Sequence, residues 1–367
     1  MSGVKHETRA VVNILSSALL LAAPVLARES TDVIVMKNGD RITCEVKGLS
    51  GGVLSVSPPY VIQTISVDWS QVARLESKQL FIVKAEDGSV YRGTLNTVQT
   101  PAGDPMKIQV EGTPEKKAVL DSSRIVDVGE ASDKFLDRFT GGANLGTTYS
   151  KGNQSTQYNL SGLVAYPRER WTAQVGFSSN LNRSSGATAS TWNRVTPSFQ
   201  RLLPWNNYFF EGLAGFLQSS EQGIQAQTTL GGGIGRYLKN TNRTTIAVLG
   251  GFAWQNTSYR QSSVPIGRQN IAAPLIGGEV KVYRFNKTNL ALNTLLLPAV
   301  SEPGRVFFTT DASYYIKITG NLSWNISFYG GWDSRPPANL PASNYGTSSG
   351  LAWTFGSSLR TTPTTIQ

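Results

Sequence analysis

Cysteine and histidine are almost absent from this sequence of 367 residues. Cys44 is the only cysteine, which excludes an intramolecular disulfide, and its expected role is that of a small buried strand residue. His6 is the only histidine and lies in the predicted signal peptide, so the mature chain has none. Ser-His-Asp or Cys-His catalysis and histidine-ligated metal sites are therefore excluded. We expect no enzyme activity, no metal and no cofactor.

Charge and long apolar runs are also scarce. Charged residues make up 16% of the chain, and no apolar run after the first residues is long enough for a spanning helix. Lys5 and Arg9 precede the apolar stretch Val11 to Ala23, and Val25-Leu26-Ala27 offers small residues for cleavage. This order predicts a signal peptide over residues 1–27. A membrane anchor is the alternative, but this apolar stretch is short for a span.

Residues 28–130 contain an internal repeat. Both copies carry a turn signal between two apolar strands, Asn38-Gly39 in the first and Asp87-Gly88 in the second, and we expect type I′ hairpins there. Both copies also end alike, at residues 65–72 and 118–125. The repeat predicts two SH3-like β modules, at about 31–78 and 79–130, with about five short strands each. A single long sandwich is the alternative, and residues 131–140 are a linker with a short helix in it at most.

From Gly141 the pattern becomes repeated alternation of apolar and polar residues, as in the segment Leu322 to Phe328. Such strands, apolar outside and polar inside, are typical of outer-membrane β-barrels. The pattern therefore predicts an all-β chain with a twelve-stranded antiparallel transmembrane barrel over residues 141–356 and a tail at 357–367. We expect the strands to start near residues 141, 156, 170, 191, 207, 225, 243, 270, 288, 305, 322 and 344.

The predicted connections alternate in length. Even-numbered strands are followed by short turns, and odd-numbered strands mostly by longer loops, which is the rule for barrels with periplasmic turns and outer loops. This topology puts residues 28–130 in the periplasm of a Gram-negative cell. A soluble β-sandwich is the alternative, but it gives no reason for loop lengths to alternate. Aromatic girdles are expected at Tyr166, Trp171, Trp205, Tyr208, Tyr237 and Phe285 on the periplasmic side and at Trp192, Trp254, Tyr259 and Trp332 on the outer side.

The stretch Ser349 to Phe355 resembles the closing-strand signal that the barrel assembly machinery reads. Its signal residues are Gly350, Trp353 and Phe355. A second resemblance joins Lys37 to Arg41 and Val67-Asp68-Trp69 with the barrel opening Gly146 to Asn153. These motifs are similar to those of the salt-induced outer membrane protein family, whose function is uncharacterised. The resemblance implies an outer-membrane barrel behind an N-terminal periplasmic β domain and brings no catalytic residues. Here, unlike in that family, residues follow the last aromatic.

Positive charge is concentrated in the second part of the chain. Residues 141–367 hold 18 Lys and Arg against 7 Asp and Glu, a balance of +11, whereas residues 28–140 hold 14 against 16, a balance of −2. This charge could favour anions in the lumen or bind phosphates of lipid and lipopolysaccharide, or it could be simple solvated charge. A periplasmic rim of cations is predicted at Arg168, Arg170, Arg201, Arg236, Lys239, Arg243, Arg284 and Lys287. The compartment excludes nucleic acid as a partner.

The alternation also predicts charged side chains inside the barrel, at Arg194, Glu211, Glu279, Lys281, Asp311 and Lys317. Such residues pair across a lumen or tune its selectivity, and pairing is expected here. The three acids leave a carboxylate hydrolase as a remote alternative. Two functions remain open: a narrow channel for anions or small polar solutes, and a non-conducting anchor whose periplasmic domain binds an envelope protein or peptidoglycan.

Overall fold

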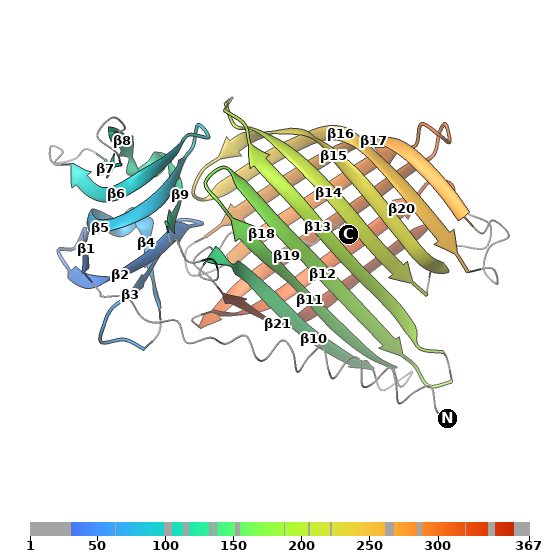
Figure 1. Ribbon diagram of the computed structural model, residues 1–367. Coiled ribbons are helices and arrows are strands. Elements are labelled where there is room, and N and C mark those ends of the chain that lie inside the picture. The colour runs from blue at the N-terminus through green and yellow to red at the C-terminus, as the bar shows by residue number, and fades with distance from the viewer. Residues whose placement is uncertain are drawn as a thin grey trace.

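The computed structural model describes residues 31–62, 64–98, 105–112, 117–131, 135, 138–186, 188–204, 206–220, 222–260, 268–284, 288–319, 321–336 and 342–355, apart from 151–154. The predicted signal peptide and tail lie outside these residues. Figure 1 shows a small sheet, coloured blue to teal, beside one end of a larger barrel. The described residues contain no helix with the length and apolar content that a membrane-spanning helix needs.

The small sheet has nine strands within the described residues, and eight follow the order β4-β3-β2-β1-β5-β6-β7-β8, while β9 pairs with β2 and β5. The ring β1–β2–β9–β5 is thereby closed. The strands are β1 (Asp32–Met36), β2 (Arg41–Ser50), β3 (Val53–Ser57), β4 (Ile65–Asp68), β5 (Val72–Ala85), β6 (Val90–Val98), β7 (Lys107–Glu111), β8 (Lys117–Asp121) and β9 (Ile125–Glu130). Short 3₁₀ turns, η2 (Trp69–Gln71) and η3 (Ser122–Arg124), follow β4 and β8 and so repeat between the two copies.

The two copies of the repeat share a hydrophobic core. β5 crosses the predicted boundary near residue 78 and pairs with β1 on one side and β6 on the other. Ile34 and Leu49 from the first copy and Phe81, Leu95 and Ile108 from the second are fully buried in that core. Cys44 is buried there too, and burial, followed by the charges of nearby acids, raises the pKa of its thiol to about 12. The copies therefore form one sheet.

The repeat hairpins form where predicted, but they are not type I′ turns. The N–H of Gly39 donates to Met36 O at 2.9 Å, and the N–H of Gly88 donates to Ala85 O at 3.0 Å. The glycines have φ of +94° and +83°, whereas among the described residues neither Asn38 nor Asp87 has a positive φ. A left-handed glycine that follows the turn twists the hairpin correctly, so the asparagine and aspartate stay in ordinary backbone.

The barrel is closed and antiparallel, with twelve strands in the described residues, which confirms the predicted fold class. Each strand pairs with the next, and the last pairs with the first. All twelve start within two residues of the predicted positions. They are β10 (Thr140–Ser150), β11 (Ser155–Pro167), β12 (Trp171–Arg183), β13 (Ser190–Leu202), β14 (Tyr208–Ser219), β15 (Ile224–Asn240), β16 (Thr244–Tyr259), β17 (Arg268–Tyr283), β18 (Thr288–Pro298), β19 (Val306–Thr319), β20 (Leu322–Asp333) and β21 (Ser343–Phe355).

The outer face of the barrel is apolar and exposed, as the alternation requires. Phe252 is 74% exposed and Leu351 54% exposed, whereas their neighbours Ala253 and Ala352 are buried. Water-exposed apolar side chains on every second residue are the mark of a surface that meets lipid. Aromatic rings gather at the short-turn end of this face, where Phe139, Tyr166, Trp171 and Phe199 form a chain with centroid distances of 5.1, 5.9 and 5.7 Å.

The predicted aromatic girdles are wrong at three positions. Trp192, Tyr237 and Tyr259 face the lumen: Trp192 stacks on Tyr329, Tyr237 donates to Gln200 at 3.0 Å, and Tyr259 is 8% exposed. They lie at the strand ends, as expected, but at positions whose alternation points inward. Trp205 and Phe285 lie outside the described residues.

Candidate functional site: the lumen and its two ends

The short-turn end of the barrel touches the small sheet through polar contacts. Asn207, in the turn between β13 and β14, donates its side-chain N–H to the carbonyl oxygen of Glu86 at 2.7 Å. Arg243, between β15 and β16, lies 3.6 Å from Asp68. An opposite pair joins Glu169, between β11 and β12, to Arg92 at 3.8 Å. The contacts thus come from turns spread around the rim.

Two further contacts involve residues that face the lumen. Lys317, near the end of β19, donates from Nζ to Ser66 Oγ at 2.5 Å. Gly51 packs on Tyr283 at the end of β17, so closely that a Cβ on Gly51 would lie 3.1 Å from the Tyr283 ring. Gly51 has φ of +59°, a left-handed conformation that glycine adopts at little cost. Because Lys317 and Tyr283 point inward, the small sheet reaches over the opening at this end (Figure 1). We call it the cap domain.

Of the predicted rim cations, Arg243 is the one whose described contacts include an ion pair with the cap domain. Arg236 points outward, and its guanidinium lies 5.2 Å from the ring centre of Tyr208. Lys287 lies outside the described residues. The remaining rim cations lie at or next to the short turns, as the sequence predicted: Arg168, Arg170, Arg201, Lys239 and Arg284. Arg168 is half-buried, and the other four are exposed. Their effect as a group stays a prediction.

Neutralising Arg236, Lys239 and Arg243 together is expected to loosen the cap domain. Exposed ion pairs contribute about 0.2–1 kcal/mol, so limited proteolysis of the cap should become about 2- to 5-fold faster at low salt, with the difference fading at high salt. Arg243→Gln alone should give most of this effect, because Arg243 touches Asp68. Arg236→Gln, which faces outward, is the matched control. If the triple variant and the wild type were proteolysed at equal rates, the rim cations would not hold the cap domain and would serve only to contact lipid phosphates.

The six predicted lumen charges all lie on inward-facing positions. Glu279 and Lys281 pair at 2.7 Å on β17. Arg194 on β13 lies within electrostatic reach of Asp311 on β19. With Glu211 and Lys317 the set holds three cations and three acids, so its formal charges balance. A balanced interior gives little reason to select anions over neutral solutes.

The lumen departs from the expected polar interior on one side. Inward positions of β14 and β16 to β19 carry Leu213, Leu249, Leu275, Leu297 and Phe307, which pack together. The expectation of a polar inner face is therefore wrong for this part of the wall. Here the side chains of neighbouring strands pack together inside the barrel as a small core does.

Described residues of the barrel line two cavities on its inner side. The first has an empty volume of about 580 Å³, and the three predicted acids Glu211, Glu279 and Asp311 all line it beside Leu213 and Leu249. The second has an empty volume of about 510 Å³ and is lined mostly by asparagine, serine and tyrosine. Asp311 lines both. The structure thus brings these three acids, which lie on the separate strands β14, β17 and β19, to the wall of one cavity. The described residues hold no cluster of three or more histidine, cysteine, aspartate or glutamate side chains that could bind a metal ion.

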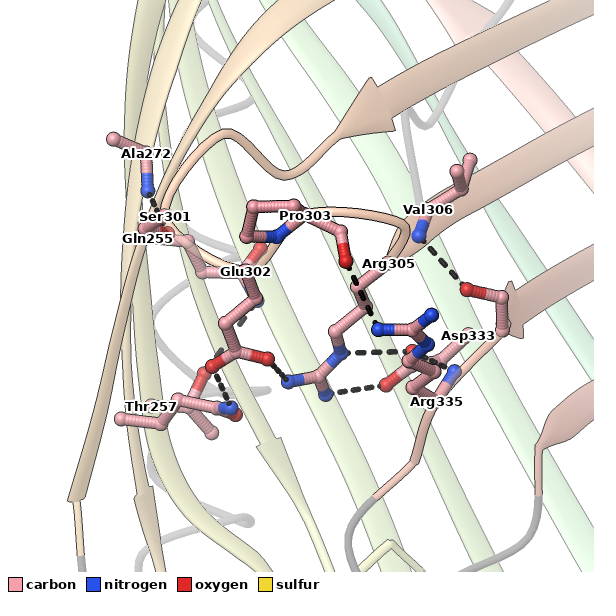
Figure 2. Close-up of polar contacts among 12 residues, drawn as sticks. Gln255, Thr257, Ala272, Ser301, Glu302, Pro303, Arg305, Val306, Asp333 and Arg335 are labelled. Atoms are coloured by element: carbon pink, nitrogen blue, oxygen red, sulfur yellow. Dashed lines mark hydrogen bonds and ion pairs between the residues drawn. The ribbon is translucent and has the colours of Figure 1, made fainter.

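The long-loop end is held by a buried arginine that the sequence analysis missed. Arg305, between β18 and β19, is 2% exposed. Figure 2 shows it lying between two acids: Nη1 donates to Glu302 at 2.7 Å, and Nε and Nη2 donate to Asp333 at 2.9 and 2.5 Å. Gln269, at the start of β17, also donates to Glu302 at 2.7 Å. We call these four residues the outer clamp, since they join three connections of the barrel.

The charges of the outer clamp stabilise one another. Burial alone would lower the pKa of Arg305, but hydrogen bonds to Asp333 and Glu302 outweigh it and raise that pKa above its ordinary value. Burial would raise the pKa of Glu302, but hydrogen bonds from Arg305 and Gln269 hold it below its ordinary value. A loop arginine in a Pro-Gly-Arg turn gave no sequence signal of this role, because Asp333, which binds two of its nitrogens, lies in a different connection of the barrel.

Comparison with known families matches the chain to a family of unknown function. The family described as "Protein of unknown function, DUF481" matches residues 143–355. No curated protein matches the chain in sequence. Similar solved chains include the NanC porin, with 11% identity, a TM-score of 0.38 and coverage of 58% of this chain and 98% of that one. The translocator domain of autotransporter NalP from Neisseria meningitidis has 10% identity, a TM-score of 0.35 and coverage of 59% and 87%. Because the matched residues span more than half of the chain and nearly the whole barrel, this protein belongs to the DUF481 family.

Proposed function

We propose that the chain is a Gram-negative outer-membrane barrel that passes small polar solutes, and that its cap domain covers the periplasmic mouth. The observation that carries this proposal is the pair of lumen-facing residues, Lys317 and Tyr283, that meet the cap across the opening. Among β-sheet structures, only a closed barrel with an apolar outer face suits a bilayer, because its strands pair all the way round and no sheet edge meets lipid. On the motifs given above, we assign the chain to the salt-induced outer membrane proteins.

The partners follow from the same surfaces. The exposed aliphatic rows suit outer-membrane lipid, and so does the chain of four aromatic rings at the short-turn end. Arg236 points outward at the same end and suits a phosphate of inner-leaflet lipid. Strand β21, with Trp353 and Phe355 on its outer face, suits recognition by the barrel assembly machinery. The balanced lumen charges favour neutral polar solutes over anions. The proposed solutes are therefore a narrower class than the anions or small polar solutes suggested by the net positive charge of the barrel.

A reversible cross-link between cap and barrel tests the proposal. A Cβ on Gly51 would lie 3.2 Å from Cβ of Tyr283, close to the roughly 3.5–4.5 Å of a disulfide. The double variant Gly51→Cys/Tyr283→Cys is therefore expected to lock the cap in place when oxidised. In liposome-swelling assays with a neutral polyol, flux should fall at least fivefold on oxidation and recover with dithiothreitol. Each single cysteine variant is the matched control and should not respond to oxidation.

Two outcomes would overturn parts of this proposal. Equal flux in the oxidised and reduced double variant would show that the cap does not cover the path. No flux in either state, with correctly inserted protein, would remove the passage itself. That second result would favour the other function, a non-conducting anchor whose cap domain binds an envelope protein or peptidoglycan.

A further inference from the structure

The second lumen cavity has an unusual lining. Fourteen residues surround it, among them four asparagines, five serines and two tyrosines, and Asp311 is the one charged residue of that lining. They come from six neighbouring strands of the closed barrel, in the order β19, β20, β21, β10, β11 and β12. Its empty volume is about 510 Å³. We call this cavity the amide chamber.

Several amide atoms of this chamber lack a protein partner. Asn144 donates from Nδ2 to Asn325 Oδ1 at 2.8 Å, which leaves Asn144 Oδ1 and Asn325 Nδ2 without one. Asn159 accepts from Gln157 at 3.2 Å, but its own Nδ2 has no partner. These three asparagines are 7%, 1% and 7% exposed. A buried polar atom left unsatisfied costs roughly 1–3 kcal/mol, so the chamber is built to be completed by another molecule.

The chemistry of that molecule follows from the donors and acceptors. Asparagine amides and serine hydroxyls offer both a donor and an acceptor, and they match a group that does the same, such as a hydroxyl. A carboxylate or phosphate only accepts, so it would lose its hydration and still leave an acceptor such as Asn144 Oδ1 unpaired. An ammonium only donates and would leave the amide donors unpaired.

An aromatic pair stands at the chamber wall. Tyr329 lines the chamber, and Trp192 stacks on it with ring centres 6.1 Å apart and planes 17° apart. Solutes with many hydroxyls in a ring present polar edges and an apolar face of C–H groups, so such a pair complements them. We infer that the amide chamber binds a neutral polyhydroxylated solute of the class of mono- and disaccharides. The inference rests on the proposed passage, which gives the solute its route to the chamber.

Binding to purified barrel in detergent tests this inference without requiring transport. Calorimetric titration with glucose, maltose and sucrose is expected to give saturable binding, whereas gluconate and inorganic phosphate of the same concentration should bind at least tenfold more weakly. The double variant Asn144→Ala/Asn325→Ala removes two amides and should weaken sugar binding about 10-fold or more, at roughly 1 kcal/mol for each lost hydrogen bond. Asn256→Ala is the matched control, because Asn256 pairs with Asn270 on exposed positions of β16 and β17.

A second variant guards against misfolding, since Asn144 and Asn325 also bridge two strands. Asn159→Ala removes an unpartnered amide and should weaken sugar binding about 3- to 10-fold while leaving the folded band on unboiled gels unchanged. Sugar binding of wild type that the chamber variants leave unaltered would overturn the inference, and so would binding of gluconate or phosphate in place of neutral sugars. Sugar binding without flux in the cross-linking assay would instead overturn the proposed passage and keep the binding site.

Discussion

A Gly350→Ala variant is expected to fail at barrel closure. A Cβ at residue 350 would lie 2.4 Å from the carbonyl oxygen of Leu145 and 2.8 Å from Asn144 Oδ1. The carbonyl belongs to the facing strand, so relief requires the two strands to separate. This seam is short: β10 and β21 pair over five residue pairs, whereas β10 and β11 pair over eleven. The added methyl group would destabilise the β10–β21 seam by about 1–3 kcal/mol through overpacking, and this seam has few residue pairs to hold it together.

The measurement is the folded fraction. Correctly closed barrels migrate differently on gels before and after boiling, and we expect the folded band of Gly350→Ala to drop at least fivefold in outer-membrane fractions. Gly250→Ala is the matched control, because a Cβ at Gly250 on the outer face meets no atom within 4 Å. If the two alanine variants gave equal folded fractions, the close approach at Gly350 would not limit closure.

Replacing Arg305 by alanine is expected to open the long-loop end of the barrel. The change leaves Asp333 and Glu302 without their shared cation, and removing one partner of a buried charge pair costs about 3–5 kcal/mol. Asp333 and Glu302 are 19% and 40% exposed at their side chains, so we expect a loss at the lower end, about 2–3 kcal/mol. Arg305→Lys should recover only part of it, because an ammonium cannot bond Asp333 through two nitrogens as the guanidinium does.

Chemical unfolding in detergent, followed by tryptophan fluorescence, measures this loss. Arg335→Ala is the matched control, since Arg335 lies in the same loops (Figure 2) and donates to Pro303 O at 2.9 Å from an exposed position. It should cost less than about 1 kcal/mol, as typical for a single exposed hydrogen bond. A loss for Arg305→Ala no larger than that for Arg335→Ala would mean that the clamp does not hold the loops.

The clamp also makes the stability depend on pH in a defined direction. The pKa of Glu302 is lower in the folded protein, so its contribution is complete above the ordinary glutamate value of about 4.3 and is lost as the pH falls through the lower folded value. The stability difference between wild type and Arg305→Ala should therefore shrink in the acid range and stay constant near neutrality.

The sequence by itself determined the number, starts and facing of the barrel strands. Alternation with a period of two is a local property, so Leu322 to Phe328 reveal which face meets lipid without any knowledge of neighbours. The same parity put Glu211, Glu279 and Asp311 inside. The same alternation places Trp192 and Tyr237 on inward-facing positions. Their assignment to the aromatic girdles was based on their place at strand ends and disregarded this alternation.

Only the tertiary structure decided what those inward side chains meet. Asn144 and Asn325 are far apart along the chain and become neighbours because β21 closes the barrel with a glycine between them. Lys317 reaches Ser66 in the other domain, and Arg305 reaches Asp333 in a different connection of the barrel. The shared core of the two repeats arises in the same way, since β5 joins both halves. Strand periodicity describes which way a residue points, but contact across a lumen or between domains depends on register and closure, which no local pattern encodes.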